Sequence, residues 1–216
     1  MRLGVLVSGR GSNLEAVLRA VAAGRLPGVE PVLVIANRPD VRALAVAARH
    51  GVPARVLTRR AFPDAGQRDR AIGDAIAAAR CDLVLLAGYD QLLRAEYFAA
   101  YPGVTINIHP SLLPRHGGRG MMGIAVHRAV LAAGDGETGV TIHEVTPDLD
   151  AGPILAREVV PVAPGEDAEQ LARRVLRVEH RLLVATLRRL AAEGSPREAS
   201  ARMTAVPRDR RAGERT

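Results

Sequence analysis

Short apolar runs alternate with stretches of helical periodicity from the first residues of the chain. The runs 2–7 and 31–36 are rich in Val, Leu and Ile, which predicts two strands. Between them, apolar residues recur at the i, i+3, i+4, i+7 spacing of an amphipathic helix: Leu14, Val17, Leu18 and Val21. The same rhythm predicts helices at 41–50, 67–80 and 95–101 and strands at 53–58, 82–87 and 104–108.

Continuously apolar strands separated by helices are typical of a parallel sheet that is covered on both faces. The pattern changes after about residue 137, where two strand-like runs, 139–146 and 153–162, flank a loop rich in Pro, Asp and Gly. A long helix at 168–193 follows. We therefore expect one α/β domain over 1–193, with a mostly parallel sheet that has helices on both faces and an antiparallel C-terminal addition. Residues 194–216 are expected to form a basic, loosely ordered tail.

Composition is that of an ordinary globular protein, with 48% apolar and 25% charged residues among 216. The single cysteine, Cys81, excludes a disulfide framework. No apolar run is long enough to cross a bilayer, and the first residues lack a signal-peptide pattern. We expect a soluble protein in the reducing cytoplasm, with no membrane partner.

The net charge is +7, and all 30 basic residues are arginine. About three of the excess charges lie in the tail, after residue 196. Recognition of single-stranded nucleic acid needs aromatic stacking platforms, and the chain has three Tyr, two Phe and no Trp. A small anionic substrate explains the positive balance, and no nucleic-acid partner is expected.

The first predicted strand ends in Ser-Gly-Arg-Gly-Ser-Asn, residues 8–13, and a helix follows at once. Glycines and a helix N-terminus together present backbone N–H groups to an anion, which indicates a phosphate site. A plain tight turn is the alternative. Leu14 stands where the dinucleotide fingerprint needs a third glycine, and a P-loop needs a lysine that the chain lacks.

Asn107 and His109 leave the same face of the strand at 104–108, and Pro110 ends that strand. Both side chains are then expected at the carboxyl edge of the sheet, where open α/β sheets bind ligands. A carboxamide beside an imidazolium suits an oxyanion that develops from a carbonyl. A His and an Asn that satisfy loop backbone are the alternative.

Three motifs carry a family resemblance: the turn at 8–13, the segment Asn-Ile-His-Pro-Ser-Leu-Leu-Pro at 107–114, and Asp-Leu-Asp-Ala-Gly-Pro-Ile at 148–154. Together they resemble the phosphoribosylglycinamide formyltransferases, from Leu3 to about residue 193. The resemblance implies that family's Rossmann-like formyltransferase fold. It also implies transfer of a formyl group from 10-formyltetrahydrofolate, the cosubstrate, to the amine of glycinamide ribonucleotide in purine synthesis.

By the same resemblance, Asn107, His109 and Asp150 match the family's catalytic residues. The first two would stabilise the oxyanion. Asp150, if it lies near His109, would favour the charged imidazolium and assist a proton relay. No metal is required, and the histidines show no zinc-ligand spacing.

The resemblance places the ribonucleotide phosphate at Gly11, Ser12 and Asn13. It also places Glu179, which precedes His180, near the substrate amine. Glu179 falls in the middle of an apolar face of the long helix, formed by Ala172, Val175, Leu176, Leu182, Leu183, Thr186, Leu187 and Leu190. A buried carboxylate there needs a partner, either the ligand or a protein group such as an arginine.

The resemblance also places the folate at Asp90, Gln91, Leu92 and Leu93, together with Asn107. This sequence departs from the family at that loop, which usually reads Met-Arg-hydrophobic-Leu. Ala65 stands where an arginine is common, with Arg68 as a possible substitute. The segment at 115–123 looks longer and richer in glycine than in common members. It is either a mobile lid or a plain surface insertion.

Two alternatives stay open. One is another enzyme that uses 10-formyltetrahydrofolate, such as the deformylase, and the other is a non-catalytic phosphate- or RNA-binding relative. The expected partners are the two small-molecule substrates, and the chain is expected to be a monomer or a homodimer.

Overall fold

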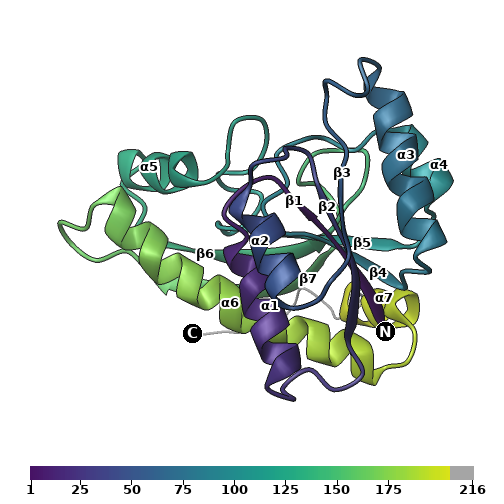
Figure 1. Ribbon diagram of the computed structural model, residues 1–216. Coiled ribbons are helices and arrows are strands. Elements are labelled where there is room, and N and C mark those ends of the chain that lie inside the picture. The colour runs from purple at the N-terminus through teal and green to yellow at the C-terminus, as the bar shows by residue number, and fades with distance from the viewer. Residues whose placement is uncertain (205–216) are drawn as a thin grey trace.

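The computed structural model describes residues 1–204, which form one seven-stranded sheet with helices on both faces (Figure 1). The strands are β1 (Arg2–Val7), β2 (Glu30–Ala36), β3 (Ala54–Val56), β4 (Leu83–Leu86), β5 (Val104–His109), β6 (Glu137–Glu144) and β7 (Ile154–Pro161). The helices are α1 (Ser12–Ala22), α2 (Arg42–Arg49), α3 (Ala65–Ala78), α4 (Ala95–Ala100), α5 (Ile124–Ala132), α6 (Ala168–Ala192) and α7 (Pro196–Thr204).

The strand order is β3-β2-β1-β4-β5-β6-β7. The first five strands in the chain pair in parallel, whereas β5–β6 and β6–β7 pair antiparallel. This confirms the predicted fold class, including the antiparallel addition after residue 137. The strand order reverses at β1, where β2 lies on one side and β4 on the other, and this is the position at which open α/β sheets bind ligands.

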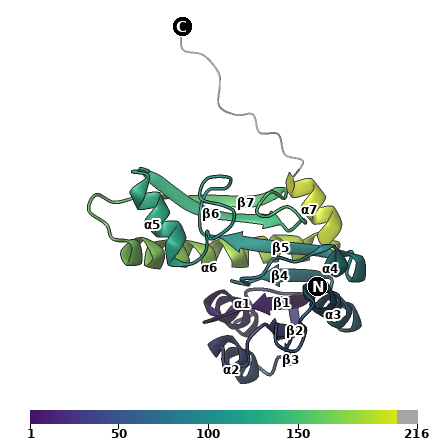
Figure 2. The same ribbon diagram turned by 90° about the horizontal axis from the view of Figure 1, so that it is seen from above.

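Two apolar cores lie on opposite faces of the sheet. Helices α1, α2 and α6 pack on one face, and α3 and α4 pack on the other (Figure 2). Alternate residues of β4 enter the two cores, with Leu83 and Leu85 in one and Val84 and Leu86 in the other. Burial on both faces explains why β4 is apolar without interruption.

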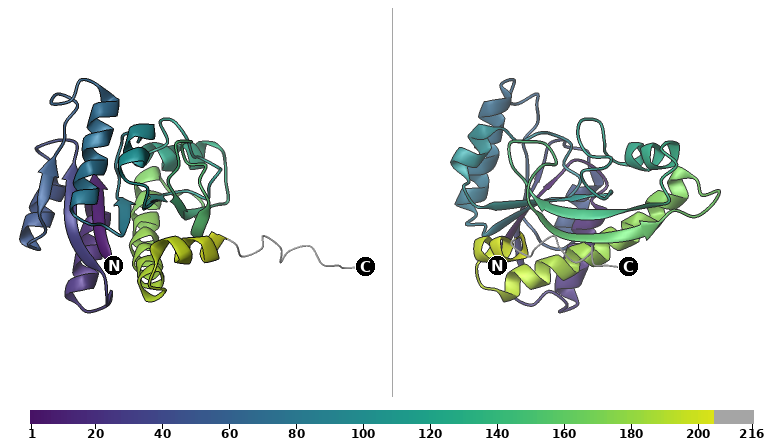
Figure 3. Two further views of the ribbon diagram at one scale, coloured as in Figure 1. Left: turned by 90° about the vertical axis from the view of Figure 1, so that its right-hand side faces the viewer. Right: turned by 180° about the vertical axis from the view of Figure 1, so that it is seen from behind.

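The long α6 runs along β6 and β7 and also contacts α1 and α5 (Figure 3). A capping box fixes its first turn, because the Asp167 side chain accepts from the Gln170 N–H and the Gln170 side chain accepts from the Asp167 N–H. Within the described part of the chain, no helix is long and apolar enough to cross a membrane.

Two helices were not predicted. α5 has nine residues and directly follows the glycine-rich segment, where only a lid or a surface insertion was expected. α7 forms the first part of the expected tail. Pro196 reads as a loop signal, yet it occupies the first position of this helix, where proline is favoured. Ala199 and Met203, four residues apart, are buried against the core. The rest of the expected tail, 205–216, lies outside the described residues.

Candidate active site

The glycine-rich turn after β1 places a helix N-terminus at the carboxyl edge of the sheet. Gly11 is the N-cap of α1 and has a left-handed backbone, with φ of 71°. A Cβ on Gly11 would lie 2.8 Å from the Cα of Ala43 in α2, so the backbone angle and the neighbouring helix both require glycine. The first N–H groups of a helix have no acceptor within it, and its dipole favours negative charge there. The turn therefore has the geometry of an anion site.

Glu179 on α6 reaches across to α1. Its Oε2 accepts a hydrogen bond of 2.7 Å from Nδ2 of Asn13, and both residues are buried. Burial raises the pKa of Glu179, and the Asn13 hydrogen bond opposes that shift. The carboxylate thus has the partner that its position on an apolar face requires, and this partner is an amide, not an arginine. Oδ1 of Asn13 is buried and has no hydrogen-bond partner among residues 1–204.

Asn107, His109 and Asp150 come together where β5 ends. Nδ1 of the buried His109 lies 4.0 Å from Oδ2 of Asp150. Asp150 has a left-handed backbone, with φ of 54°, and the same Oδ2 accepts a 2.7 Å hydrogen bond from the Gly118 N–H. The glycine-rich segment therefore orients the carboxylate that faces the imidazole. Among the residues described, no three His, Cys, Asp or Glu side chains are arranged to hold a metal ion.

His143 completes this cluster from the antiparallel strand β6, where it lies opposite Asn107 in the register. Its Nδ1 is 2.8 Å from the Glu144 carbonyl oxygen, which can only accept, so Nδ1 carries the hydrogen. Its Nε2 lies 3.1 Å from Nδ2 of Asn107 and 3.7 Å from Oδ1 of Asp150. Burial lowers the pKa of His143, which favours the neutral ring. A neutral Nε2 accepts from Asn107 and fixes the orientation of its carboxamide.

The segment after β5 folds back over His109. Nε2 of His109 lies 2.8 Å from the carbonyl oxygen of His116, so this nitrogen carries a hydrogen. The His116 ring is itself 2.6 Å from Oδ2 of Asp135. Arg115 contacts Asp135 at 3.6 Å and Glu137 at 3.3 Å. The first part of the glycine-rich segment is therefore anchored, and its backbone orients the central imidazole.

Asp90, one of the predicted folate residues, ties together the ends of three strands. Its Oδ1 accepts a 2.6 Å hydrogen bond from Nδ2 of Asn37, and its other oxygen pairs with Arg38. Its N–H donates to Oγ of Ser8 at 2.9 Å. The Asp90 carboxylate is thus engaged by two residues that follow β2, and its backbone N–H is engaged by the residue that follows β1.

The other predicted folate residues divide into two kinds. Leu93 is part of the core between the sheet and α3. Leu92 is 50% exposed, and Gln91 is half-buried with Oε1 at 3.5 Å from the Tyr89 hydroxyl. Of the four predicted side chains, Gln91 and Leu92 are therefore the two that remain open to a ligand.

Arg68 does not replace the arginine expected at Ala65. It is 3% exposed, and its guanidinium donates twice to Oδ1 of the buried Asp69, at 3.0 and 2.7 Å. The other oxygen of Asp69 accepts from the Arg94 N–H at 3.0 Å. This buried pair positions the end of the loop before α4, and Arg68 is not available to a ligand.

Sequence reasoning missed the residues that support the site. Ser8 was noted only as part of the glycine-rich turn, Asn37 and Asp135 were not singled out, and His116 was included only as part of the segment at 115–123. The one available signal was that Ser8 and Asn37 each directly follow an apolar strand, at the edge where ligands bind.

Known proteins resemble the chain over most of its length. A family model described as formyl transferase matches residues 1–187. The chain is 39% identical over 184 residues to "Phosphoribosylglycinamide formyltransferase, chloroplastic" of Arabidopsis thaliana, which covers 85% of this chain and 63% of that protein. It is 33% identical over 181 residues to "Phosphoribosylglycinamide formyltransferase" of Haemophilus influenzae, covering 84% of this chain and 82% of the relative. The chain spans about three fifths of the length of its plant relatives.

Solved structures agree with this comparison. The glycinamide ribonucleotide transformylase 1 of Symbiobacterium toebii superposes with a TM-score of 0.83 at 39% identity, covering 89% of this chain and 88% of that one. The phosphoribosylglycinamide formyltransferase of Bacillus halodurans gives a TM-score of 0.83 at 33% identity, covering 90% and 97%. The resemblance drawn from the motifs at 8–13, 107–114 and 148–154 is confirmed: the chain belongs to the formyl transferase family.

Proposed function

We propose that this protein transfers the formyl group of 10-formyltetrahydrofolate to the amine of 5'-phosphoribosylglycinamide. The names of the bacterial and plant relatives support this substrate and this reaction. The products are formylglycinamide ribonucleotide and tetrahydrofolate. Both substrates are small molecules, in agreement with a site at the sheet edge.

The observation that carries the proposal is the separation of two groups along that edge. The anion site follows β1, and the cluster of Asn107, His109 and Asp150 follows β5, with β4 between them. Neighbouring strands are about 4.8 Å apart, so the two groups lie roughly 10 Å apart. A ribonucleotide whose phosphate binds at the turn would extend its glycinamide amine to the end of β5.

The phosphate would accept hydrogen bonds from the first N–H groups of α1, at Gly11, Ser12 and Asn13. The amine would lie near Glu179. Oε2 of Glu179 already accepts from Asn13, which leaves Oε1 as the acceptor for the amine.

The reaction begins when the lone pair of the substrate amine attacks the formyl carbon. A C–N bond forms, and the carbonyl π electrons move to the formyl oxygen, which becomes anionic. Donors from Asn107 and from Nε2 of His109 would stabilise that oxygen, each contributing about 2.7–4 kcal/mol. For His109 this requires its Nε2 hydrogen to turn from the His116 carbonyl toward the substrate.

Collapse of the tetrahedral intermediate breaks the bond between the formyl carbon and the departing folate nitrogen. The attacking nitrogen must lose a proton, and the departing nitrogen must gain one. Asp150, at 4.0 Å from His109, stabilises an imidazolium that carries this proton. His143 holds Asn107 in place and stays neutral, so it does not compete for the negative charge of Asp150.

The formyl-folate would bind at the loop after β4, with Gln91 and Leu92 as the side chains that face it. The backbone of this loop is held by Asp90 through Ser8, Asn37 and Arg38, so its N–H and C=O groups are rigidly presented. Asn107 would contact the same ligand at its formyl group.

The test measures formyl transfer from 10-formyltetrahydrofolate to glycinamide ribonucleotide, with water as the competing acceptor. The wild-type chain should form formylglycinamide ribonucleotide and release little formate. His109→Ala and Asp150→Asn should each reduce kcat by at least about a hundredfold, which corresponds to about 2.7 kcal/mol of transition-state stabilisation.

Two exposed residues provide matched controls. His50→Ala, at the end of α2, and Asp74→Asn, on α3, remove the same groups far from the site and should leave kcat unchanged. Circular dichroism should be the same for all four variants. Formate release without transfer to the ribonucleotide would contradict the proposal and favour a deformylase, and full activity in His109→Ala would contradict the mechanism.

A further inference from the structure

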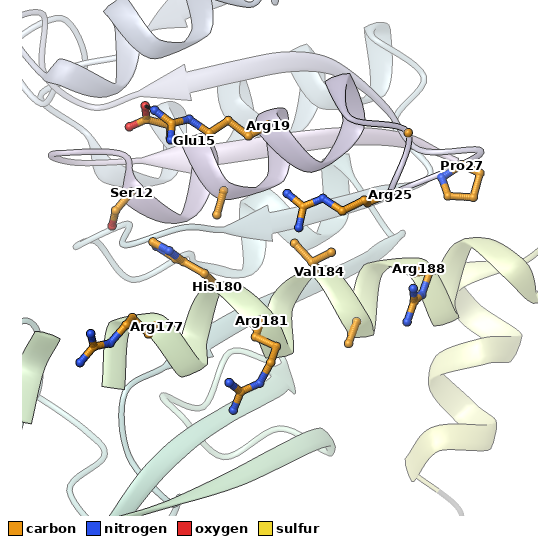
Figure 4. A pocket seen from close by; sticks show the side chains of 13 residues that line it. Ser12, Glu15, Arg19, Arg25, Pro27, Arg177, His180, Arg181, Val184 and Arg188 are labelled. Carbon is orange, nitrogen blue, oxygen red and sulfur yellow. Dashed lines mark hydrogen bonds and ion pairs between the residues drawn. The ribbon is translucent and has the colours of Figure 1, made fainter. Parts of the chain in front are cut away.

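A basic pocket of about 790 Å³ lies between α1 and α6 (Figure 4). It extends from Ser12 and Arg177 at one end to Pro27 and Arg188 at the other, with His180 and Val184 between the two helices. Five arginines line it: Arg19, Arg25, Arg177, Arg181 and Arg188. One carboxylate, Glu15, faces them. We call this pocket the α1–α6 groove.

Glu15 does not balance the charge of the groove. It pairs with Arg19 at 2.7 Å, with Arg42 at 2.8 Å and with Arg49 at 3.7 Å, so three cations already share it. Arg181 pairs with Glu158. The described residues offer no ion pair to the other three arginines, which are exposed: Arg25, Arg177 and Arg188. The groove thus carries a net positive charge that the described protein groups leave uncompensated.

The arginines of α6 lie on one face of the helix. Arg177 and Arg181 are four residues apart, and Arg188 is seven residues further, so all three fall within a narrow sector. From Arg177 to Arg188 the helix rises roughly 16 Å. Like charges at i, i+4 destabilise a helix. The repulsion between these arginines is therefore reduced most by an anion that has several charges spread along the row.

We propose that the α1–α6 groove binds a phosphate-rich small molecule with a chain of phosphate groups. Guanidinium groups recognise phosphate by paired hydrogen bonds as well as by charge. The floor of the groove is apolar and is formed by Ala16, Val184 and Ala185. The ligand can therefore be a bare phosphate chain or a phosphate chain that carries a nucleoside. No Phe, Tyr or Trp lines the groove, so it lacks the large stacking platforms that single-stranded nucleic acid uses.

The groove also has a functional consequence, which rests on the proposed function. Ser12 belongs both to the groove and to the turn assigned to the ribonucleotide phosphate. An oligophosphate in the groove would place negative charge beside that turn. It would then act as a competitive inhibitor of the ribonucleotide, raising its KM without changing kcat.

The binding test uses the full chain without either substrate. Inorganic tripolyphosphate and ATP are titrated separately by calorimetry, without magnesium and at low ionic strength. The double variant Arg25→Gln, Arg188→Gln should bind tripolyphosphate about a hundredfold more weakly than the wild type. Each arginine then contributes about tenfold, which corresponds to ~1.4 kcal/mol. Equal affinities for the two probes would assign the site to the phosphate chain alone, and tighter binding of ATP would assign a nucleoside to the apolar floor.

The matched control combines Arg55→Gln with Arg70→Gln, two exposed arginines on β3 and α3, and should bind tripolyphosphate as the wild type does. Basal formyl transfer should be unchanged in both double variants. Equal binding by the groove variant and the wild type would overturn the proposal, as would tighter, arginine-dependent binding of a single-stranded oligonucleotide. Binding is measured without catalysis, so the two proposals are tested separately. A protein that binds tripolyphosphate but does not transfer the formyl group would refute only the proposed function.

Discussion

Glu179→Gln separates the binding role of a buried carboxylate from its effect on stability. In the folded protein, Glu179 accepts one hydrogen bond from Asn13 and is otherwise enclosed by the apolar face of α6. Gln has nearly the same shape and keeps an oxygen that can accept the same hydrogen bond. The substitution therefore removes the negative charge and leaves the packing in place.

The magnitude follows from two opposing contributions. Burying an ionised carboxylate costs several kcal/mol, and a hydrogen bond to a charged group returns about 1.5–3 kcal/mol. We expect Glu179→Gln to stabilise the free protein by about 1 kcal/mol near pH 8, or about 2–4 °C in Tm for a chain of this size. Ribonucleotide binding should weaken by about tenfold to a hundredfold, because the amine loses its charged acceptor.

The gain in stability depends on pH. Burial raises the pKa of Glu179, against the opposing effect of the Asn13 hydrogen bond, so the folded protein keeps this proton to higher pH than the unfolded chain. The stability that comes from the neutral carboxyl is fully present below the unfolded pKa and is lost as the pH rises through the raised folded pKa. Gln does not ionise and avoids this loss. The variant should therefore match the wild type near pH 4 and exceed it near pH 8.

The measurements are melting curves at both pH values and a calorimetric titration with glycinamide ribonucleotide. Glu169→Gln is the matched control, because Glu169 is an exposed carboxylate on the same helix. It should change neither Tm nor affinity appreciably. A Glu179→Gln protein that melts several degrees earlier at pH 8 and still binds the ribonucleotide normally would refute the reasoning and make Glu179 a structural residue.

Two further predictions concern the backbone around the site. Gly28→Ala should destabilise the protein by about 1 kcal/mol, because Gly28 has a positive φ, and Gly11→Ala should destabilise it by more. Gly11 also has a positive φ, and its added Cβ would lie 2.8 Å from Ala43. Equal melting temperatures of the two variants would contradict this. Asp135→Ala should lower kcat about tenfold with a small change in Tm, because Asp135 anchors His116, whose carbonyl oxygen orients the central imidazole. Unchanged kcat would show that this anchor has no part in the reaction.

Local patterns were sufficient to predict the sheet and its edge. β4 is apolar at every position because both of its faces are covered, and that run is visible in the sequence. Asn107 and His109 were placed correctly because a strand alternates its side chains and Pro110 ends it. The buried position of Glu179 followed from helical periodicity alone.

Contacts between distant residues were not predictable in the same way. Asn13 and Glu179 are 166 positions apart, so the amide partner depends on how α1 and α6 pack. His143 faces Asn107 because of the β5–β6 register, which the sequence does not specify. Arg68 was the possible substitute for the arginine that is common at the position of Ala65, but the fold turns it inward onto Asp69. In each case tertiary packing decided what the side chain can do.

The antiparallel strand β6 contributes to the central cluster at the end of β5. Thr141 lies opposite His109 and His143 lies opposite Asn107 in the register of the two strands. Because β6 runs back along β5, it brings His143 beside Asn107. The loop that leaves β6 then carries Asp150 toward His109. The antiparallel addition therefore supplies two groups of the site and is part of its chemistry as well as of its fold.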